Sequence, residues 1–238
     1  MPPKDDIFDL LERSLPQKSV KEKSILVVTS KIVAISQGRC IKIESVKDKS
    51  QLIKKESDLY LDREEYPNKW GVMLTMKNNI LIPTAGIDES NANGYYVLWP
   101  EKPFEAAKEI HSFVKEKFNI KELGVIISDS HTTPLRLGVG GIAVSYHGFD
   151  PLRSYIGIKD IFGRAMKFSQ SNIADSIADA SVLVMGECAE QTPLAIVEDI
   201  DFVKFGGTGS VENPLIIDKK EDLYSPLLNS VNWKKGGT

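Results

Sequence analysis

Residues 123–130 read LGVIISDS, and the fold class follows from this stretch. Its first part is almost wholly apolar, which is typical of a strand in the middle of a sheet, covered on both faces. Asp129 follows the apolar run, at the end of the strand where open sheets bind their ligands. The stretch therefore predicts a buried central strand with a polar, functional end.

The segments on either side alternate between helical and strand patterns. We expect helices at residues 5–15, 103–118 and 172–187, with Asn172 as the N-cap of the last. We expect strands at 24 to about 30, 40–46, 141–149, 193–200 and 201–205, and a hairpin at 71–86. Residues 47–69 are expected to be exposed and partly helical, and 91–103 to be a loop or edge strand. Hairpins mixed with helical crossovers predict an α+β or mixed α/β fold.

Composition restricts the class of protein. The 238 residues are 42% hydrophobic and 26% charged, enough for one domain or two subdomains. The net charge of −3 argues against nucleic-acid binding through a basic face. Cys40 and Cys188 are too few for a disulfide scaffold and predict reduced thiols in a cytoplasmic protein. No apolar stretch approaches the roughly 20 residues that span a bilayer, and no signal-peptide pattern begins the chain.

Three carboxylates follow apolar runs beside small residues: Asp88 in PTAGIDESNANG, Asp129, and Glu187 in ASVLVMGECAEQTP. Acids gathered at the rim of a core suggest a divalent cation, because hard cations are held by carboxylates, phosphate oxygens and water. Glu187 is the most suggestive, since a carboxylate at a helix C-terminus opposes the helix dipole. The alternative is that these acids only form Asx-turns and caps.

Three further features fit phosphate chemistry less specifically. The run LRLGVGG, residues 135–141, contains glycines whose N–H groups could approach phosphate, beside Arg136. It is not a Walker A loop, and a bend before a strand explains it equally well. Ser30 and Lys31 end the first apolar run, where a solvated lysine is the alternative. His131 is kept only as an acid/base or supporting residue, because no zinc spacing accompanies it.

Several stretches resemble the coenzyme F-420 gamma-glutamyl ligase family. They are SKIVAISQGR, TAGIDESN, GVIISDS followed by Arg136 and Gly138, IGIKDIFGRAMKFSQSNIADSIADASVLVMGE, and the strand after Pro193. Together they extend over most of residues 25–200. The resemblance implies an α+β protein with mixed sheets, hairpins and packed helices, in which residues 1–238 form one unit of two interleaved subdomains.

The resemblance also implies an activity. Members join L-glutamate to a lactyl-phospho-deazaflavin acid, using GTP and Mg²⁺ or Mn²⁺, and they form homodimers. The expected partners are thus a nucleotide, L-glutamate or a similar amino acid, and a small-molecule acid, with no nucleic acid and no membrane. The expected reaction activates the acid as an acyl phosphate, stabilised by cations and positive side chains.

Site residues are carried over by position. The metal ligands fall on Asp88, Asp129 and Glu187, and the positive charge for catalysis on Arg136 or Lys31. Nucleotide contacts fall on Ser30, Lys31, Asn91, Ser130, Met185, Gly186, Cys188, Ala189, Glu190, Gln191 and Thr192.

The chain departs from the family pattern in the nucleotide half. Ile35 stands where the family has lysine, Gln37 where it has glutamate, and Thr132-Thr133 where an arginine is usual. A helical pattern replaces the family's N-terminal proline-containing segment. These differences leave GTP or ATP open as the nucleotide, and the acceptor acid unidentified. The alternatives are a metal-dependent nucleotide or phosphate binder without ligase turnover, and a scaffold whose acids only cap turns.

Overall fold

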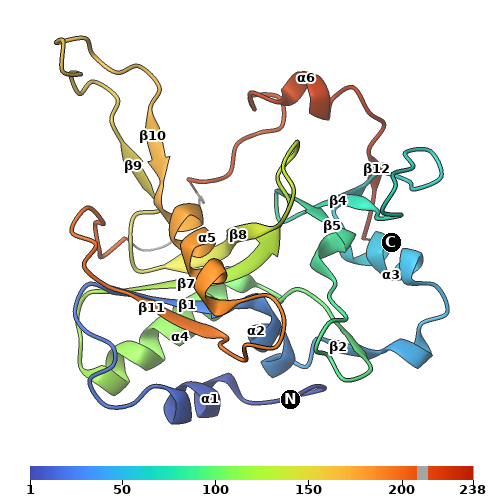
Figure 1. The fold of residues 1–238 in the computed structure, drawn as a ribbon, viewed down its shortest axis with the longest axis horizontal. Helices are drawn as coiled ribbons and strands as arrows, with labels where there is room; N and C mark the ends of the chain where they lie inside the picture. Colours follow the sequence, from blue (N-terminus) through green and yellow to red (C-terminus); the bar gives the residue numbers. More distant parts are fainter. Residues whose placement is uncertain (208–213, 238) are drawn as a thin grey trace.

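A central mixed sheet organises the molecule, seen in a computed structural model that describes residues 1–207 and 214–237 (Figure 1). Its strand order is β11-β1-β7-β8. The strands are β1 (Ser24–Thr29), β7 (Leu123–His131), β8 (Gly140–His147) and β11 (Leu194–Val197). β1 and β7 run parallel, whereas β11 and β8 pair antiparallel at the two edges. The stretch 123–130 therefore lies inside the sheet, as predicted.

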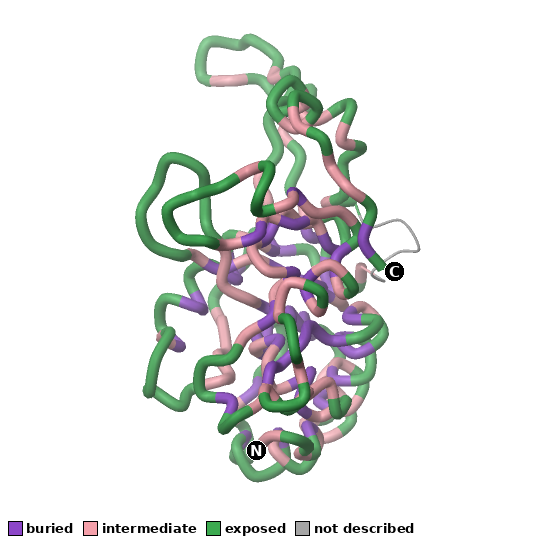
Figure 2. Tube along the Cα trace, turned by 90° about the vertical axis from the view of Figure 1, so that its right-hand side faces the viewer, coloured by how far each residue is buried: buried purple, intermediate pink, exposed green. Residues whose placement is uncertain are grey.

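Helices cover both faces of this sheet. Alternate residues of β1 and β7, such as Leu26 and Val125, pack with α1 (Ile7–Ser14) and α4 (Pro103–Phe118). The residues between them, such as Val27 and Ile126, pack against α5 (Ile173–Met185). Burial on both faces explains why these strands are continuously apolar. In Figure 2 the buried residues gather in the body of the molecule, and the projecting loops are exposed.

A second group of small elements packs beside the central sheet. One sheet has the order β12-β3-β4-β5, and β2 pairs with β6. The strands are β2 (Cys40–Lys42), β3 (Leu59–Tyr60), β4 (Leu74–Lys77), β5 (Ile80–Pro83), β6 (Tyr95–Val97) and β12 (Lys234–Lys235). The helices and 3-10 turns around them are η1 (Ile43–Ser45), α3 (Lys49–Glu56) and η2 (Thr84–Gly86).

Three more elements complete the described chain. The helix α2 (Ser30–Ser36) follows β1 directly. The strands β9 (Leu152–Ser154) and β10 (Gln170–Asn172) form the base of a long projecting hairpin, residues 152–172, which we call the arm (Figure 1). A short helix α6 (Ser225–Leu228) lies near the C-terminus. The α+β class with mixed sheets, hairpins and packed helices is confirmed.

Some local predictions are confirmed and others are wrong. The 71–86 hairpin forms, and Asn172 caps α5 by accepting from the Asp175 N–H at 3.0 Å. The predicted strand 201–205 is wrong: its first residues make a turn, and only Phe205 bridges to Phe149. The predicted strand 40–46 stops at Lys42. The first strand ends at Thr29, and the residues after it form α2, because their buried side chains repeat at helical spacing.

In the part of the chain that the structure describes, no helix is both long and apolar enough to span a bilayer.

Candidate functional site

Asp88 and Lys31 join two segments that are distant in the sequence. Lys31 lies in the first turn of α2, and its Nζ is 2.5 Å from Asp88 Oδ2. The same ammonium donates to the carbonyl and hydroxyl of Ser90 at 3.0 and 3.2 Å. Burial by itself raises the pKa of Asp88, but the Lys31 ion pair and the Ser90 hydrogen bonds outweigh it and hold the pKa below its ordinary value. Asp88 is therefore a stable carboxylate.

Asp129 lies near the end of β7, in the most buried position of the three acids. It accepts hydrogen bonds from the Trp99 indole Nε1, from the Ser130 N–H at 2.9 Å and from the Ser30 hydroxyl. Burial raises the pKa of Asp129 to about 6 despite these three donors, and the Asp88 charge adds to the rise. Ionising Asp129 is thus unfavourable unless a further positive charge lies close to its carboxylate.

Glu187 follows the C-terminus of α5, where Gly186 turns the chain with a φ of 81°. Burial raises the pKa of Glu187, and the charges of Asp88 and Glu190 raise it further. A hydrogen bond from the Ser130 hydroxyl and the charge of Lys31 act in the opposite direction. Glu187 therefore shares the neighbour Lys31 with Asp88 and the neighbour Ser130 with Asp129.

The three acids interact, but they do not form a ligand set in this structure. Among residues 1–207 and 214–237, no three His, Cys, Asp or Glu side chains lie close enough together to hold one metal ion. Their chemistry nevertheless fits a hard cation, because all donors are oxygens and the charge of Asp88 raises the pKa of both other acids. The metal site stays a prediction.

The segment 185–192, predicted to contact a nucleotide, folds back near Asn91. The Asn91 side chain donates to the carbonyl of Cys188 at 2.7 Å. The Thr192 hydroxyl donates to the carbonyl of Met185, and the Cys188 N–H donates to Glu190 at 2.8 Å. Asn91, next to Ser90, and this loop therefore lie beside Asp88 and Glu187. Nucleotide contacts are not tested by these bonds.

Arg136 lies apart from the acids. It belongs to the exposed loop between β7 and β8 and lines a hollow beside α5. No hydrogen bond or ion pair between described residues connects its guanidinium to Asp88, Asp129 or Glu187. Of the two cations predicted for catalysis, only Lys31 contacts an acid of the site.

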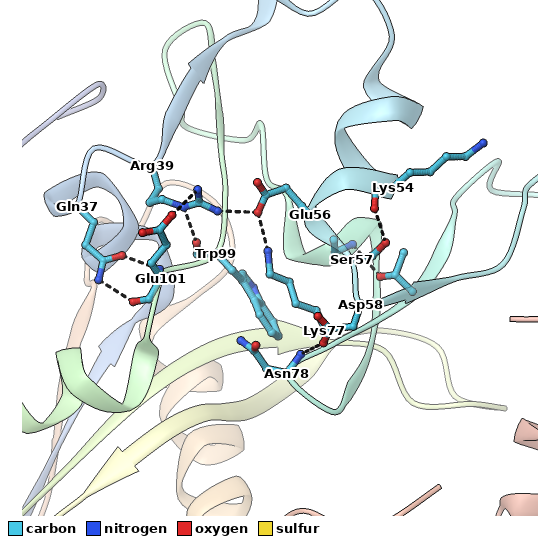
Figure 3. Close-up of polar contacts among 12 residues, drawn as sticks. Gln37, Arg39, Lys54, Glu56, Ser57, Asp58, Lys77, Asn78, Trp99 and Glu101 are labelled. Carbon is cyan, nitrogen blue, oxygen red and sulfur yellow. Dashed lines mark hydrogen bonds and ion pairs between the residues drawn. The ribbon is translucent and has the colours of Figure 1, made fainter. Parts of the chain in front are cut away.

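Trp99 is the site residue that sequence reasoning missed. Its side chain is 1% exposed and packs in the core, and its indole N–H also donates to Asp129. Its backbone carbonyl accepts from Arg39 Nε at 3.2 Å (Figure 3). An aromatic-rich segment gives no signal for such a bond, because the partner is distant in the sequence.

Next to Trp99 lies a charged cluster of Arg39, Glu56 and Lys77, which Figure 3 shows. Glu56 Oε2 contacts Arg39 Nη2 at 2.6 Å and Lys77 Nζ at 2.8 Å. Burial raises the pKa of Glu56, but the two cations outweigh it and the pKa lies below its ordinary value. The cluster ties α3, β4 and the Trp99 segment together. It thereby fixes the backbone that carries the indole.

Comparison with known proteins adds independent information. The family model described as F420-0:Gamma-glutamyl ligase matches residues 1–199. Coenzyme F420:L-glutamate ligase of Methanocaldococcus jannaschii is 32% identical over 227 residues, covering 90% of this chain and 89% of the relative. The protein of that name from Methanococcus maripaludis strain C7 is 30% identical over 217 residues, 86% of each chain. That from Methanosarcina mazei is 28% identical over 206 residues, 82% of this chain and 81% of the relative.

Proposed function

This chain belongs to the F420-0:gamma-glutamyl ligase family, and we propose accordingly that it joins L-glutamate to a small-molecule acid in an amide bond. The proposed reaction consumes GTP or ATP, requires a divalent cation and passes through an acyl phosphate. Coenzyme F420-0 is the first candidate acid, because the family model is described as F420-0:Gamma-glutamyl ligase and the relatives are named coenzyme F420:L-glutamate ligase.

One observation carries the proposal: carboxylates from three segments interact around Lys31 and Ser130. Asp88 pairs with Lys31, Asp129 adjoins Ser130, and Glu187 accepts the Ser130 hydroxyl. A fold gains nothing in stability by burying carboxylates near one another: burial raises the pKa of Asp129 and of Glu187, and the charge of Asp88 adds to both. Such an arrangement is typical of a site that binds cations and phosphates.

We assign the divalent cation to Asp88, Asp129 and Glu187. Bound there, Mg²⁺ or Mn²⁺ would neutralise phosphate oxygens during phosphoryl transfer. Lys31 supplies a positive charge at the same place, next to Ser90. Asn91, Ser30, Ser130 and the segment 185–192 border the acids and are the proposed nucleotide contacts.

The proposed chemistry balances in two steps. A carboxylate oxygen of the acid attacks the γ-phosphorus, the bond to the nucleoside diphosphate breaks, and an acyl phosphate forms. The neutral amine of L-glutamate then attacks the carbonyl carbon, phosphate leaves, and the amine loses a proton. Activation is needed because a free carboxylate would have to expel oxide.

We also propose that the protein is a homodimer whose interface includes the arm. Ile161, Phe162 and Phe168 on the arm are 92%, 89% and 87% exposed, and Leu183 and Val184 at the end of α5 are 85% and 79% exposed. Large apolar side chains exposed on a projecting arm are typical of interaction surfaces. Light scattering after size exclusion should give twice the chain mass, and Phe162→Asp should shift the protein toward monomer.

The ligase proposal is tested by turnover. The wild type is incubated with Mg²⁺, GTP or ATP, L-glutamate and coenzyme F420-0, and phosphate release and the amide product are measured. We expect phosphate release to depend on both substrates and Lys31→Met to abolish it. Lys21→Met, which removes a surface pair with Glu198, should retain activity and serves as the control.

The outcomes separate the alternatives. Metal-dependent nucleotide binding in calorimetry, without turnover on any acid offered, would favour a nucleotide-binding protein that is not a ligase. An absence of metal-dependent heat with either nucleotide would contradict both functions and leave the acids as turn-capping residues.

A further inference from the structure

A hollow of about 410 Å³ lies between the β7–β8 loop and the helix α5. Its walls carry Arg136, the backbone of Gly140 and Gly141, and three side chains from one face of α5: Asp175, Ser176 and Asp179. The hollow therefore combines one guanidinium and the His131 imidazole with two carboxylates. The proposed metal and nucleotide residues do not line it.

Two glycines allow α5 to approach the sheet edge here. A Cβ on Gly141 would lie 2.3 Å from the carbonyl oxygen of Ala178, and one on Gly140 would lie 2.5 Å from Asp179 Oδ1. Because both positions lack side chains, helical carboxylates reach the outer N–H groups of β8. Asp179 Oδ1 accepts from Gly141 at 2.7 Å. The glycines thus serve helix–strand packing rather than a phosphate loop.

The carboxylates of Asp175 and Asp179 differ in how many of their oxygens accept hydrogen bonds. Asp175 Oδ1 accepts from the Ala143 N–H at 2.9 Å, and Asp175 Oδ2 accepts from the Asn172 side chain at 2.5 Å. Asp179 uses only Oδ1, and within the described residues its Oδ2 has no hydrogen-bond partner. Asp179 is therefore anchored by one oxygen, and its side chain is exposed at the hollow.

Arg136 provides the opposite charge. Its backbone N–H closes a turn to the Thr133 carbonyl at 3.2 Å, which orders the loop. In the described parts of the chain, no carboxylate pairs with its guanidinium. A guanidinium is the preferred group for binding a carboxylate through two parallel hydrogen bonds.

The hollow lies next to Asp129 and Glu187, separated from them only by the paired strands β7 and β8. Gly141 of β8 lies directly opposite Ser130 of β7, and the Ser130 hydroxyl binds Glu187. A ligand in the hollow is thus placed beside the edge where we propose phosphoryl transfer.

We propose that the hollow binds the α-amino acid substrate as a zwitterion, with its α-carboxylate on Arg136 and its ammonium on Asp179. This inference rests on the proposed ligase function and gives its amino-acid substrate a site. A nucleotide phosphate is excluded there because Asp175 and Asp179 would repel it, whereas an ammonium group is attracted. The ammonium is then held next to the acids, and it becomes the nucleophile once it has lost a proton to solvent.

The proposal is tested by saturation-transfer NMR with three probes. L-Glutamate carries both groups, glutarate lacks the ammonium, and 4-aminobutyrate lacks the α-carboxylate. Asp179→Asn keeps the oxygen that accepts from Gly141 and removes the charge. We expect it to weaken L-glutamate binding about tenfold and to leave glutarate unchanged, because only the ammonium interaction is lost. Arg136→Gln should weaken L-glutamate and leave 4-aminobutyrate unchanged.

Two variants serve as controls. Asp175→Asn removes a charge whose oxygens already accept from Ala143 and Asn172, so it should lower the melting temperature and weaken L-glutamate binding less than Asp179→Asn does. Arg153→Gln removes an arginine of the arm that lies over Tyr155, and it should bind L-glutamate as the wild type does. Equal binding of L-glutamate by the wild type, Asp179→Asn and Arg136→Gln would overturn the assignment, as would no saturable binding by the wild type.

Failure of this inference is distinguishable from failure of the ligase function. Turnover that depends on L-glutamate, with a KM unchanged in Asp179→Asn and Arg136→Gln, would leave a ligase whose amino acid binds elsewhere. Binding of L-glutamate that both variants weaken, without turnover, would leave an amino-acid site on a protein that is not a ligase.

Discussion

The indole Nε1 of Trp99 donates a hydrogen bond to Oδ2 of Asp129 and so joins the segment between β6 and α4 to the end of β7. The ring also lies against Gly86, two residues before Asp88. One buried side chain thereby contacts the segments that carry two of the three acids. Its own backbone is held by Arg39, which pairs with Glu56.

Replacing Trp99 by phenylalanine tests this link. The variant keeps a ring and loses the donor, so the Asp129 charge is less stabilised and the pKa of Asp129 rises further. We expect about 2 kcal/mol lower stability in urea unfolding at pH 7.5, since hydrogen bonds to charged groups contribute roughly that much. Trp233→Phe, which removes a bond to the Leu228 carbonyl, is the control and should leave Mn²⁺ affinity unchanged. If Trp99→Phe binds Mn²⁺ with the same affinity as the wild type, Trp99 is excluded from the site.

Asp129→Asn should stabilise the protein in the absence of ligands. The folded-state pKa of about 6 lies above the ordinary 3.8, so the native state binds this proton more tightly than the unfolded state. Stability from this group is present below about pH 4 and is lost as pH rises through 6. Removing the charge should therefore favour folding at pH 7.5 by up to about 3 kcal/mol and abolish metal binding. The asparagine NH2 cannot accept from Trp99 or Ser130 as the carboxylate does, and the donor left unpaired offsets about 1–3 kcal/mol of that gain. Lower stability of the variant at pH 7.5 would show that the charge is structural.

His111 should make the protein less stable in acid. Burial lowers the pKa of His111 to about 4, with the charges of His147 and Lys115 adding to it. The unfolded state then binds a proton that the native state does not, so stability falls as pH drops from about 6.5 to 4.

His111→Gln keeps a donor for the Leu123 carbonyl and removes the titration. In urea unfolding, the free energy of unfolding of this variant should fall less between pH 7.5 and 4.5 than that of the wild type. An unchanged difference between the two pH values would remove His111 from the explanation.

Gly86→Ala should destabilise the protein strongly. The added Cβ would lie 2.1 Å from the Trp99 indole nitrogen, at a φ of 71°. Gly38 has the same φ, and in the described residues no atom beyond its own chain neighbours lies within 4 Å of the position that its Cβ would take. Gly38→Ala therefore isolates the cost of the backbone conformation. We expect about 1 kcal/mol for Gly38→Ala and at least about 3 kcal/mol for Gly86→Ala in urea unfolding. Similar losses in both would mean that the indole moves aside at little cost.

Local patterns predicted the elements that pack by simple periodicity. The apolar run before Asp129 gave β7, the helical repeat before Glu187 gave α5, and Asn172 was identified as its cap. The helix α2 at residues 30–36 was not predicted, because its β-branched residues favour a strand. The pattern failed at 201–205, where the chain turns before a strand can pair.

The central strand, the α+β class and the acids at the rim of the core could all be predicted from the order of residues, because they follow from the spacing of apolar residues along the chain. Three relationships emerged only from the folded molecule. Lys31 pairs with Asp88, Trp99 binds Asp129, and Arg136 lines a hollow with Asp179, apart from the three acids. Each joins positions separated by tens of residues. They depend on how sheets and helices pack, and periodicity within a segment carries no information about its partner.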